Sequence, residues 1–155
     1  MNNEIYSNPL CERYSSKEMM YNFSPDKKFS TWRKLWIALA ESEKELGLNI
    51  SQEQIDEMKN IHNTDYELAA KKEKEFRHDV MAHVHTFGTQ APLAMPIIHL
   101  GATSAFVGDN TDLIQIKDGL QIIKAKLINV MNNLSKFALD NKSVATLGFT
   151  HFQAA

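Results

Sequence analysis

The feature that most constrains this chain is a long apolar stripe in its last third. Apolar residues recur there in alternating steps of three and four, the spacing of one helix face, and the stripe consists of Leu113, Ile116, Leu120, Ile123, Leu127, Val130, Leu134 and Phe137. A helix from Asp112 to Asp140 would be about 43 Å long at a rise of 1.5 Å per residue. A compact domain of 155 residues has a diameter of only roughly 40 Å. The stripe therefore predicts long helical partners, from the same polypeptide or from other subunits, packed nearly parallel or antiparallel to it.

Composition and charge place the chain among ordinary soluble globular proteins. It is 43% hydrophobic and 23% charged, and its formal net charge of −2 gives no general attraction to nucleic acid or to an anionic membrane. The lone Cys11 cannot form an internal disulfide, and no run is apolar enough for a signal peptide or a membrane span. We therefore expect a cytoplasmic protein with no nucleic-acid partner and no membrane partner.

Helix-start signals divide the region before the stripe into short helices. The first fourteen residues lack a period and predict an extended arm, after which Ser15 or Ser16 opens a short helix to about Phe23. A second helix is predicted to start at Ser24-Pro25 and to stop at Gly47. Its three- and four-residue spacing predicts an apolar core face of Trp32, Leu35, Trp36, Leu39 and Leu46. Capping boxes predict two further helices, from Ser51-Gln52-Glu53-Gln54 to about Ile61 and from Thr64-Asp65-Tyr66-Glu67 to about Phe76.

The stretch from Ile98 to Asp112 connects an apolar, strand-like run to the predicted long helix. Gly101 allows the backbone to turn or to approach a ligand closely. Thr103 and Ser104 can cap a helix whose free N–H groups favour a negative ligand group, which outlines an anion site. The alternative is that Thr103 or Ser104 serves only as an N-cap and that Asn110-Thr111-Asp112 is only a turn.

Three histidines lie close together in the run that begins with Arg77, His78 and Asp79. A metal site is disfavoured, because on a helix His78 and His85 would be roughly 10 Å apart along the axis and His83 would point elsewhere. The first three residues bring a cation, an imidazole and a carboxylate to the head of a helix, where they can meet a polyanionic ligand. Alternatively, Asp79 only complements the helix dipole and the histidines are hydrogen-bonded surface residues.

Two polar groups near the ends of the chain are also candidates. Arg13 and Tyr14 can clamp a phosphate by charge and a phenol hydroxyl, or can simply be solvated surface residues. Gly148 and the alternation after it predict a turn and a short extended segment that carries His151. Histidine transfers protons efficiently near neutral pH, so His151 is a candidate general acid or base.

Several motifs together resemble one enzyme family in their order and surroundings. They are Arg13-Tyr14-Ser15, Trp32-Arg33-Lys34-Leu35-Trp36, Arg77-His78-Asp79-Val80-Met81-Ala82-His83, His99-Leu100-Gly101-Ala102-Thr103-Ser104, Asp109-Asn110-Thr111-Asp112 and Thr150-His151-Phe152-Gln153. Essentially the whole sequence resembles the longer form of the adenylosuccinate lyase family. The Arg-Tyr arm and the Arg-His-Asp-Val run are not shared with fumarase or argininosuccinate lyase, so the resemblance is more specific than the aspartase/fumarase superfamily pattern.

The resemblance implies an all-α fold and an oligomer. Residues 1–111 would form an N-terminal helical domain, and residues 112–155 would begin a bundle of long helices that assembles a homotetramer with active sites shared between subunits. The family eliminates fumarate from adenylosuccinate, giving AMP, and from the succinyl-carboxamide intermediate of purine synthesis. It requires no cofactor and no metal, and its ligand is a small nucleotide.

The resemblance also assigns roles to the residues around the reacting succinyl group. His151 occupies the position of the general acid of the family. Thr103 and Ser104 match residues that hold a succinyl carboxylate. Thr150 and Gln153 flank the acid and are expected to orient it or the substrate.

Two further groups match residues that bind the rest of the substrate. Arg77, His78 and Asp79 match a substrate-binding triplet in which His78 lies close to the reacting part. Arg13 and Tyr14 match a pair that contacts the nucleotide through its phosphate.

Two departures from the family pattern affect the expected activity. The Gln-Pro-Ala sequence of the family reads Gln153-Ala154-Ala155 here, so a rigid proline is missing. The serine that acts as general base in the family lies beyond these residues, and we expect an N-terminal fragment with little or no turnover of its own. The alternatives are a non-catalytic helical assembly module and another fumarate-releasing lyase of the superfamily.

Overall fold

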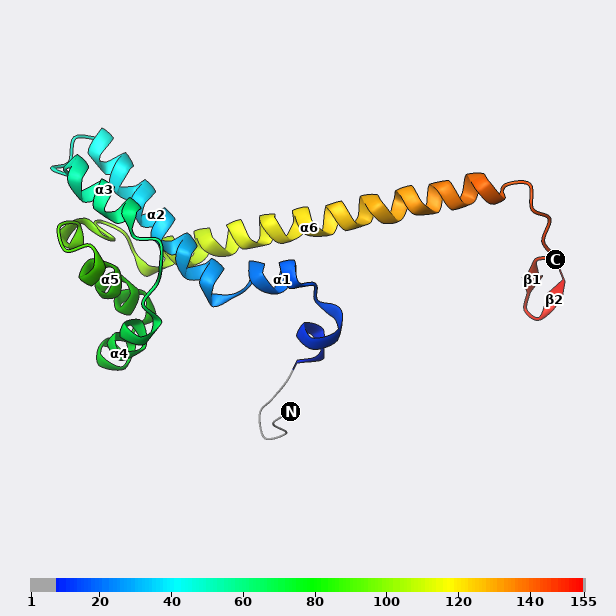
Figure 1. The fold of residues 1–155 in the computed structure, drawn as a ribbon, viewed down its shortest axis with the longest axis horizontal. Helices are drawn as coiled ribbons and strands as arrows, with labels where there is room; N and C mark the ends of the chain where they lie inside the picture. The colour runs from blue at the N-terminus through cyan, green and yellow to red at the C-terminus, as the bar shows by residue number, and fades with distance from the viewer. Residues whose placement is uncertain (1–7, 155) are drawn as a thin grey trace. The chain divides into compact units, whose positions relative to one another are not determined.

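A computed structural model describes residues 8–154 of the chain and confirms the predicted all-α class (Figure 1). The elements in chain order are a π-helix η1 (Leu10–Tyr14), α1 (Lys17–Asn22), α2 (Pro25–Glu45), α3 (Gln52–Asn60), α4 (Tyr66–Phe76), α5 (Asp79–Gln90), a 3₁₀-helix η2 (Met95–Ile97), α6 (Ser104–Asn141) and the two short strands β1 (Phe149–Thr150) and β2 (Gln153–Ala154). The chain divides into two compact units, Met1–Gly119 and Leu120–Ala155. Within residues 8–154, no helix combines the length and the apolar character that crossing a membrane requires.

Most predicted helix starts are confirmed, together with their caps. The side chains of Ser16, Ser24 and Ser51 accept hydrogen bonds from backbone amides in the first turns of α1, α2 and α3. Serine hydroxyls satisfy amides that have no partner inside the helix. The predicted cap of α4 is wrong: Asp65 and not Thr64 takes this place, and the Asp65 carboxylate accepts from the Leu68 amide at 2.9 Å.

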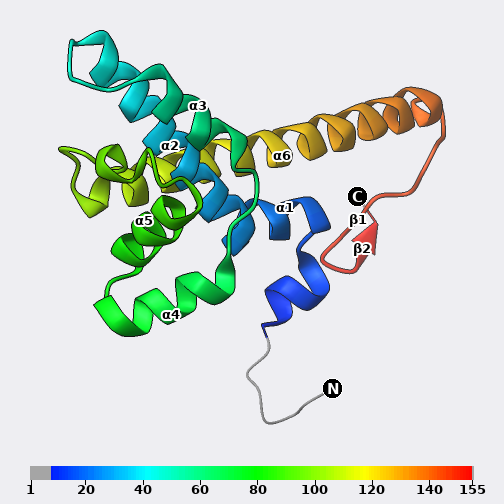
Figure 2. The same cartoon turned by 60° about the vertical axis from the view of Figure 1, so that its left-hand side comes forward.

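The core of the first unit is built around two tryptophans of α2. Trp32 and Trp36 are each 1% exposed and face each other edge to face, with ring centroids 6.1 Å apart. Figure 2 shows α2 beside α3 and α5 beside α4, and the fully buried Met58 and Phe87 join the tryptophans in one apolar cluster. The predicted apolar face of α2 is thus confirmed as core, whereas Leu46 at its end is exposed.

Helix α6 begins at Ser104, eight residues before the predicted start at Asp112. Asp109 to Asp112 therefore lie inside the helix, and the interpretation of Asn110-Thr111-Asp112 as a turn is wrong. The row that α6 buries in the first unit has four-residue steps and comprises Val107, Thr111, Gln115 and Gly119. The apolar stripe of α6 lies on other faces and is exposed, with Leu113 at 65% and Phe137 at 67%.

The predicted domain boundary between residues 111 and 112 lies within the continuous helix α6. The two compact units divide instead between Gly119 and Leu120. The division into an N-terminal helical domain of residues 1–111 and a bundle domain that begins at residue 112 stays a prediction.

A reciprocal pair of hydrogen bonds fixes α1 against α6. Asn22 Nδ2 donates to the Gln115 carbonyl at 2.7 Å, and Gln115 Nε2 donates to the Asn22 carbonyl at 2.6 Å. Both residues are buried. The Asn22 carbonyl lies at the C-terminal end of α1, where a helix leaves its last carbonyls without internal partners.

We expect Gln115→Met to destabilise the chain by about 1–3 kcal/mol, because it leaves the buried Asn22 carbonyl without a donor. Urea unfolding followed by circular dichroism measures the loss. Gln121→Met at an exposed position of the same helix is the matched control and should change stability by less than about 0.5 kcal/mol. Equal effects of the two substitutions would contradict a structural role for the Asn22–Gln115 pair.

The predicted N-terminal arm is corrected where the structure describes it. Residues 1–7 lie outside the described part of the chain, as does Ala155 at the other end. Residues 10–14 form the π-helix η1 and are not extended. The apolar run before Gly101 is likewise not a strand, because it consists of η2 and the turn that follows.

Candidate functional site

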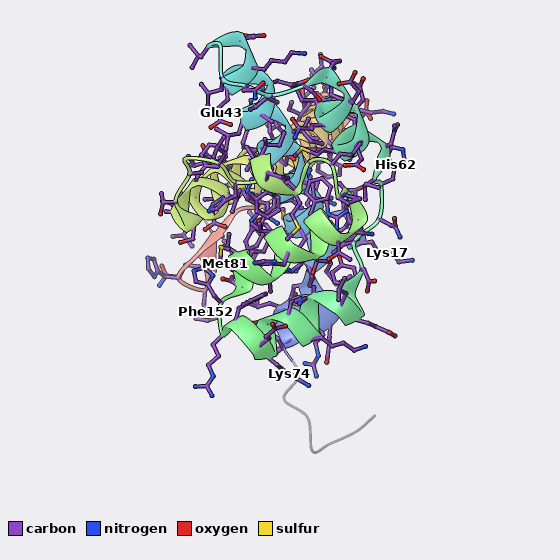
Figure 3. All side chains as sticks on the ribbon, turned by 90° about the vertical axis from the view of Figure 1, so that its left-hand side faces the viewer. Lys17, Glu43, His62, Lys74, Met81 and Phe152 are labelled. Carbon is purple, nitrogen blue, oxygen red and sulfur yellow. The ribbon has the colours of Figure 1, made fainter. Side chains whose placement is uncertain are left out.

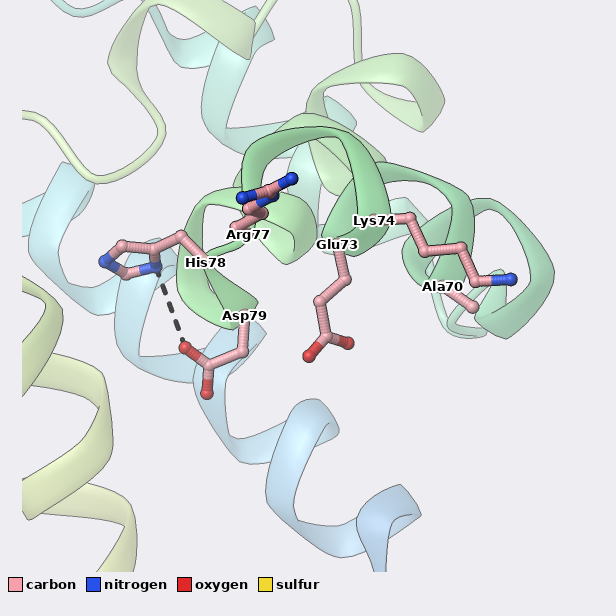
Figure 4. Close-up of a pocket in the computed structure, with 6 residues that line it drawn as sticks. All are labelled: Ala70, Glu73, Lys74, Arg77, His78 and Asp79. Atoms are coloured by element: carbon pink, nitrogen blue, oxygen red, sulfur yellow. Dashed lines mark ion pairs between the residues drawn. The ribbon is translucent and has the colours of Figure 1, made fainter.

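The residues predicted to bind the substrate through a triplet lie at the corner between α4 and α5 (Figure 4). Arg77 ends α4 in the left-handed conformation, with φ of 52°, and His78 caps the N-terminus of α5. They form part of the lining of an open cavity of about 710 Å³, to which Asp79 and Glu73 also contribute. The abrupt change from αL to extended backbone turns the chain between the two helices and brings the triplet to one concave surface.

Hydrogen bonding defines the state of His78. Its Nδ1 accepts from the Met81 amide at 3.4 Å and lies 3.7 Å from Asp79 Oδ1. A ring nitrogen that accepts this bond carries no proton, so Nε2 bears the N–H in the tautomer that caps α5. Figure 4 shows the imidazole beside the Asp79 carboxylate, whereas the Arg77 guanidinium extends to the other side of the corner. No ion pair of the described residues involves Arg77, so its charge remains available to a ligand.

His99, which belongs to one of the quoted motifs but is not a predicted site residue, lies in the turn before α6. Its Nδ1 accepts a hydrogen bond from Trp36 Nε1 at 3.0 Å, and its backbone is left-handed with φ of 66°. Burial lowers the pKa of His99, and the effect of His78 lowers it further. A histidine two residues before Gly101, at the end of an apolar run, was the only signal for this position in the sequence.

Thr103 and Ser104 lie at the N-terminus of α6. The Thr103 carbonyl accepts from the Phe106 amide at 2.9 Å, which makes it the first acceptor of the helix. Gly101 has φ of +63°, which confirms the predicted turn. Among the described residues no hydrogen bond uses the hydroxyl of Thr103 or Ser104 as a donor. Two free hydroxyls beside helix amides form an arrangement that suits a carboxylate.

Arg13 and Tyr14 lie in η1 at the surface of the first unit. Both are exposed, Tyr14 at 77%. Only Ser15 and Ser16 separate η1 from α1. The clamp of a phosphate by this pair stays a prediction.

His151 lies in the second unit, at the tip of the hairpin formed by β1 and β2. The strands pair Thr150 with Gln153 and Phe149 with Ala154. His151 and Phe152 form the turn with φ of 51° and 62°, and both side chains are exposed. Positive φ at both central residues matches the twist of a two-residue hairpin but is strained for residues other than glycine. Thr150 and Gln153 thus hold the backbone on either side of His151.

His83 is a packed side chain and not the surface residue of the alternative interpretation, whereas His85 is partly exposed. His83 is 6% exposed and stacks on Phe29 at 3.8 Å between ring centroids. His85 stacks on Phe76 at 4.4 Å. Within the described residues no three histidine, cysteine or acidic side chains come together as a metal site would require.

The buried His83 predicts a dependence of stability on pH. Burial lowers its pKa to about 4, Arg33 and Lys28 lower it as well, and Asp79 opposes them. The pKa of histidine in the unfolded chain is about 6.5. The stability of the folded chain is therefore not reduced by protonation of His83 above that pH, and it falls below that pH by up to about 1.4 kcal/mol per pH unit. His99 contributes with the same sign.

Urea unfolding at about pH 7 and about pH 5 measures this dependence. The variant His83→Leu should show a shallower loss of stability between these two conditions than the parent chain. Parallel pH profiles of the two proteins would contradict a neutral, buried His83.

Comparisons with known proteins identify relatives along nearly the whole chain. No family model matches the sequence. The chain is 56% identical to adenylosuccinate lyase of Saccharomyces cerevisiae over 154 residues, which are 97% of the chain and 32% of that protein. It is 54% identical to adenylosuccinate lyase of Schistosoma mansoni over 153 residues, 98% of the chain and 32% of the relative. Adenylosuccinate lyase of Aquifex aeolicus is 31% identical over 92% of the chain, which covers 33% of that relative.

The chain thus spans about a third of the length of the curated relatives that it matches. Identity above half over 97% of the chain confirms the predicted resemblance. The chain is therefore similar along nearly its whole length to about a third of each of these adenylosuccinate lyases.

Proposed function

We propose that this chain is the N-terminal part of an adenylosuccinate lyase, a carbon–nitrogen lyase that eliminates fumarate from adenylosuccinate. The observation that carries the proposal is the 51–56% identity to three proteins of that name over 97–98% of the chain. The same reaction on the succinyl-carboxamide intermediate of purine synthesis belongs to the proposal. The 155-residue chain is expected to release little or no fumarate by itself.

The proposed elimination requires three kinds of group. A base removes a proton from the carbon beside a carboxylate, donors stabilise the charge that develops, and an acid protonates the departing nitrogen. We assign the acid to His151, which the strained hairpin turn holds at an exposed position. Thr150 and Gln153 act as positioning residues, since they pair across the turn.

The proposed binding of the substrate uses groups of the first unit. Thr103 and Ser104 hold a succinyl carboxylate with hydroxyls and helix amides. His78 offers its Nε2–H to the substrate, and Arg77 adds a free cation. Asp79 completes the substrate-binding triplet, and Arg13 with Tyr14 contacts the phosphate of the nucleotide.

The exposed apolar stripe of α6 supports the proposed oligomer. Its side chains are half to two-thirds exposed from Leu113 to Phe137, and an unpartnered stripe of this length favours association with other long helices. We propose a homotetramer with active sites shared between subunits and no cofactor. The lone Cys11 supports a reducing compartment, so the cytoplasm is the proposed location.

The experiment that tests the function is a chimaera. The aligned part of the Saccharomyces cerevisiae relative is replaced by this chain, which is 56% identical to it, and fumarate release is measured with adenylosuccinate and argininosuccinate side by side. We expect release from adenylosuccinate alone. Release from argininosuccinate would favour another lyase of the superfamily. An assembled, folded chimaera that acts on neither would favour a non-catalytic assembly module.

A further inference from the structure

A second cavity lies between α2 and the end of α3, away from the groups assigned above. It has a volume of about 170 Å³, and its lining consists of Ser30, Arg33, Lys34, Ile37, Lys59, Ile61 and His62. Three of these side chains are cationic and no carboxylate lines the cavity. We call it the basic cavity. Figure 3 shows His62 at the surface, on the connection between α3 and α4.

Arg33 is the unusual member of the basic cavity, because it is buried and has no carboxylate partner. It is 6% exposed, and its Nη1 and Nη2 donate to two neutral acceptors, the Asn63 carbonyl at 2.7 Å and Gln90 Oε1 at 2.6 Å. The ion pairs of the described residues do not include Arg33. Asp65 acts on it only through space and is already used to cap α4.

A buried guanidinium normally pairs with an anion, because taking a charge out of water is costly. Two hydrogen bonds and the face of Phe87, 4.5 Å from the guanidinium carbon, fix the orientation of Arg33, but among the described residues they give it no directly bonded anion. Desolvation lowers the pKa of Arg33 to about 10, which still leaves it charged at neutral pH. The neighbouring Lys34 adds an exposed cation on the same wall.

We propose that the basic cavity binds a small tetrahedral oxyanion of the class of inorganic phosphate, with Arg33 and Lys34 as its main partners and Lys59 and His62 at its edge. The volume of about 170 Å³ is below the roughly 300 Å³ at which sites for drug-sized ligands begin. A nucleoside therefore does not fit, whereas a phosphate group does. Lys59 is held partly by Glu41 at 2.5 Å, so a carboxylate competes with the anion for this one lysine.

Titration of the ¹⁵N-labelled chain with inorganic phosphate at constant ionic strength tests the proposal. We expect saturable shifts of the amides of Lys34, Lys59 and His62, with a midpoint of roughly 1 mM. Lys34→Glu should weaken binding at least about fivefold. Glu41→Gln should tighten it about two- to fivefold, because it releases Lys59. Both positions are at least partly exposed, so these variants are expected to fold.

Two controls make the result decisive. Lys117→Glu makes the same charge change at an exposed position of α6 and should leave the affinity within about twofold. AMP should shift the amides of Lys34, Lys59 and His62 with a midpoint no lower than that of inorganic phosphate, since the proposed nucleotide site uses other residues. The proposal is overturned if the shifts of these three amides do not saturate, if Lys34→Glu and Lys117→Glu weaken binding equally, or if AMP saturates these amides at a lower concentration than phosphate.

Discussion

Replacement of His151 by asparagine is expected to lower fumarate release by the chimaeric enzyme about 100- to 10,000-fold, the usual contribution of a general acid. Asparagine tolerates the left-handed backbone that His151 adopts, with φ of 51°, so the turn should survive the substitution. The variant therefore lacks the proton donor but keeps the fold of the hairpin. We expect kcat to fall with little change in KM, measured by the release of fumarate from adenylosuccinate.

The matched control is Lys142→Gln, which changes an exposed polar side chain in the same unit of the chain. It should leave kcat within about twofold. If His151→Asn retained nearly full activity in a chimaera of unchanged mass and helix content, His151 would not be the acid. A rise in KM without loss of kcat would instead make it a binding residue.

The second large effect concerns stability: Trp36→Ala should destabilise the chain by about 3–5 kcal/mol. Trp36 is 1% exposed, lies against Trp32 and Phe87, and donates from Nε1 to His99 at 3.0 Å. The substitution therefore opens a cavity in the core and removes the donor that holds the His99 ring. The shift of the urea midpoint, at an unchanged denaturant slope, measures the loss.

Trp36→Phe separates the two contributions of this side chain. Phenylalanine keeps an aromatic ring in the core but cannot donate to His99, and we expect a smaller loss of about 1–3 kcal/mol. Its NMR spectrum should show the His99 ring changed while the signals of α3 stay in place. A loss below about 1 kcal/mol for Trp36→Ala would contradict the central place of this tryptophan.

The short helices were predictable because local chemistry determines where they begin. Ser24 before Pro25 and the capping box of Ser51 and Gln54 satisfy the first amides of their helices within a few residues. Asp65 shows the limit of such signals, since two adjacent residues both suit an N-cap and only the three-dimensional path selects one. The two tryptophans of α2 were predictable as core from their spacing alone.

The face that α6 buries in the first unit was not predictable from hydrophobic periodicity. The strongest apolar stripe of the chain is exposed there, whereas Thr111, Gln115 and Gly119 are buried. The reason is that Gln115 exchanges hydrogen bonds with Asn22, and Gly119 lets α1 approach, with Asn22 Nδ2 3.4 Å from where a Cβ would lie. The buried face of α6 thus consists largely of small residues and of a polar residue that is hydrogen-bonded. The apolar stripe of α6 remains exposed and available to other helices.

The candidate site was predictable mainly through motifs, because its residues lie far apart in the sequence. Local structure explains the corner of Arg77 and His78, where a left-handed residue ends one helix and an imidazole caps the next. The part played by His99 depends on its tertiary contact with Trp36, which spacing does not reveal. The burial of His83 was missed for the same reason.

In the proposed active site, polar groups from separate parts of the chain meet around one succinyl nucleotide. A crystal structure of the His151→Asn chimaera with adenylosuccinate tests this arrangement. We expect the side chain at 151 and the hydroxyls of Thr103 and Ser104 to contact the same succinyl group, contributed by whichever subunits form the site. The proposed arrangement is contradicted if Thr103 and Ser104 hold the substrate and residue 151 of no subunit in the assembly reaches it.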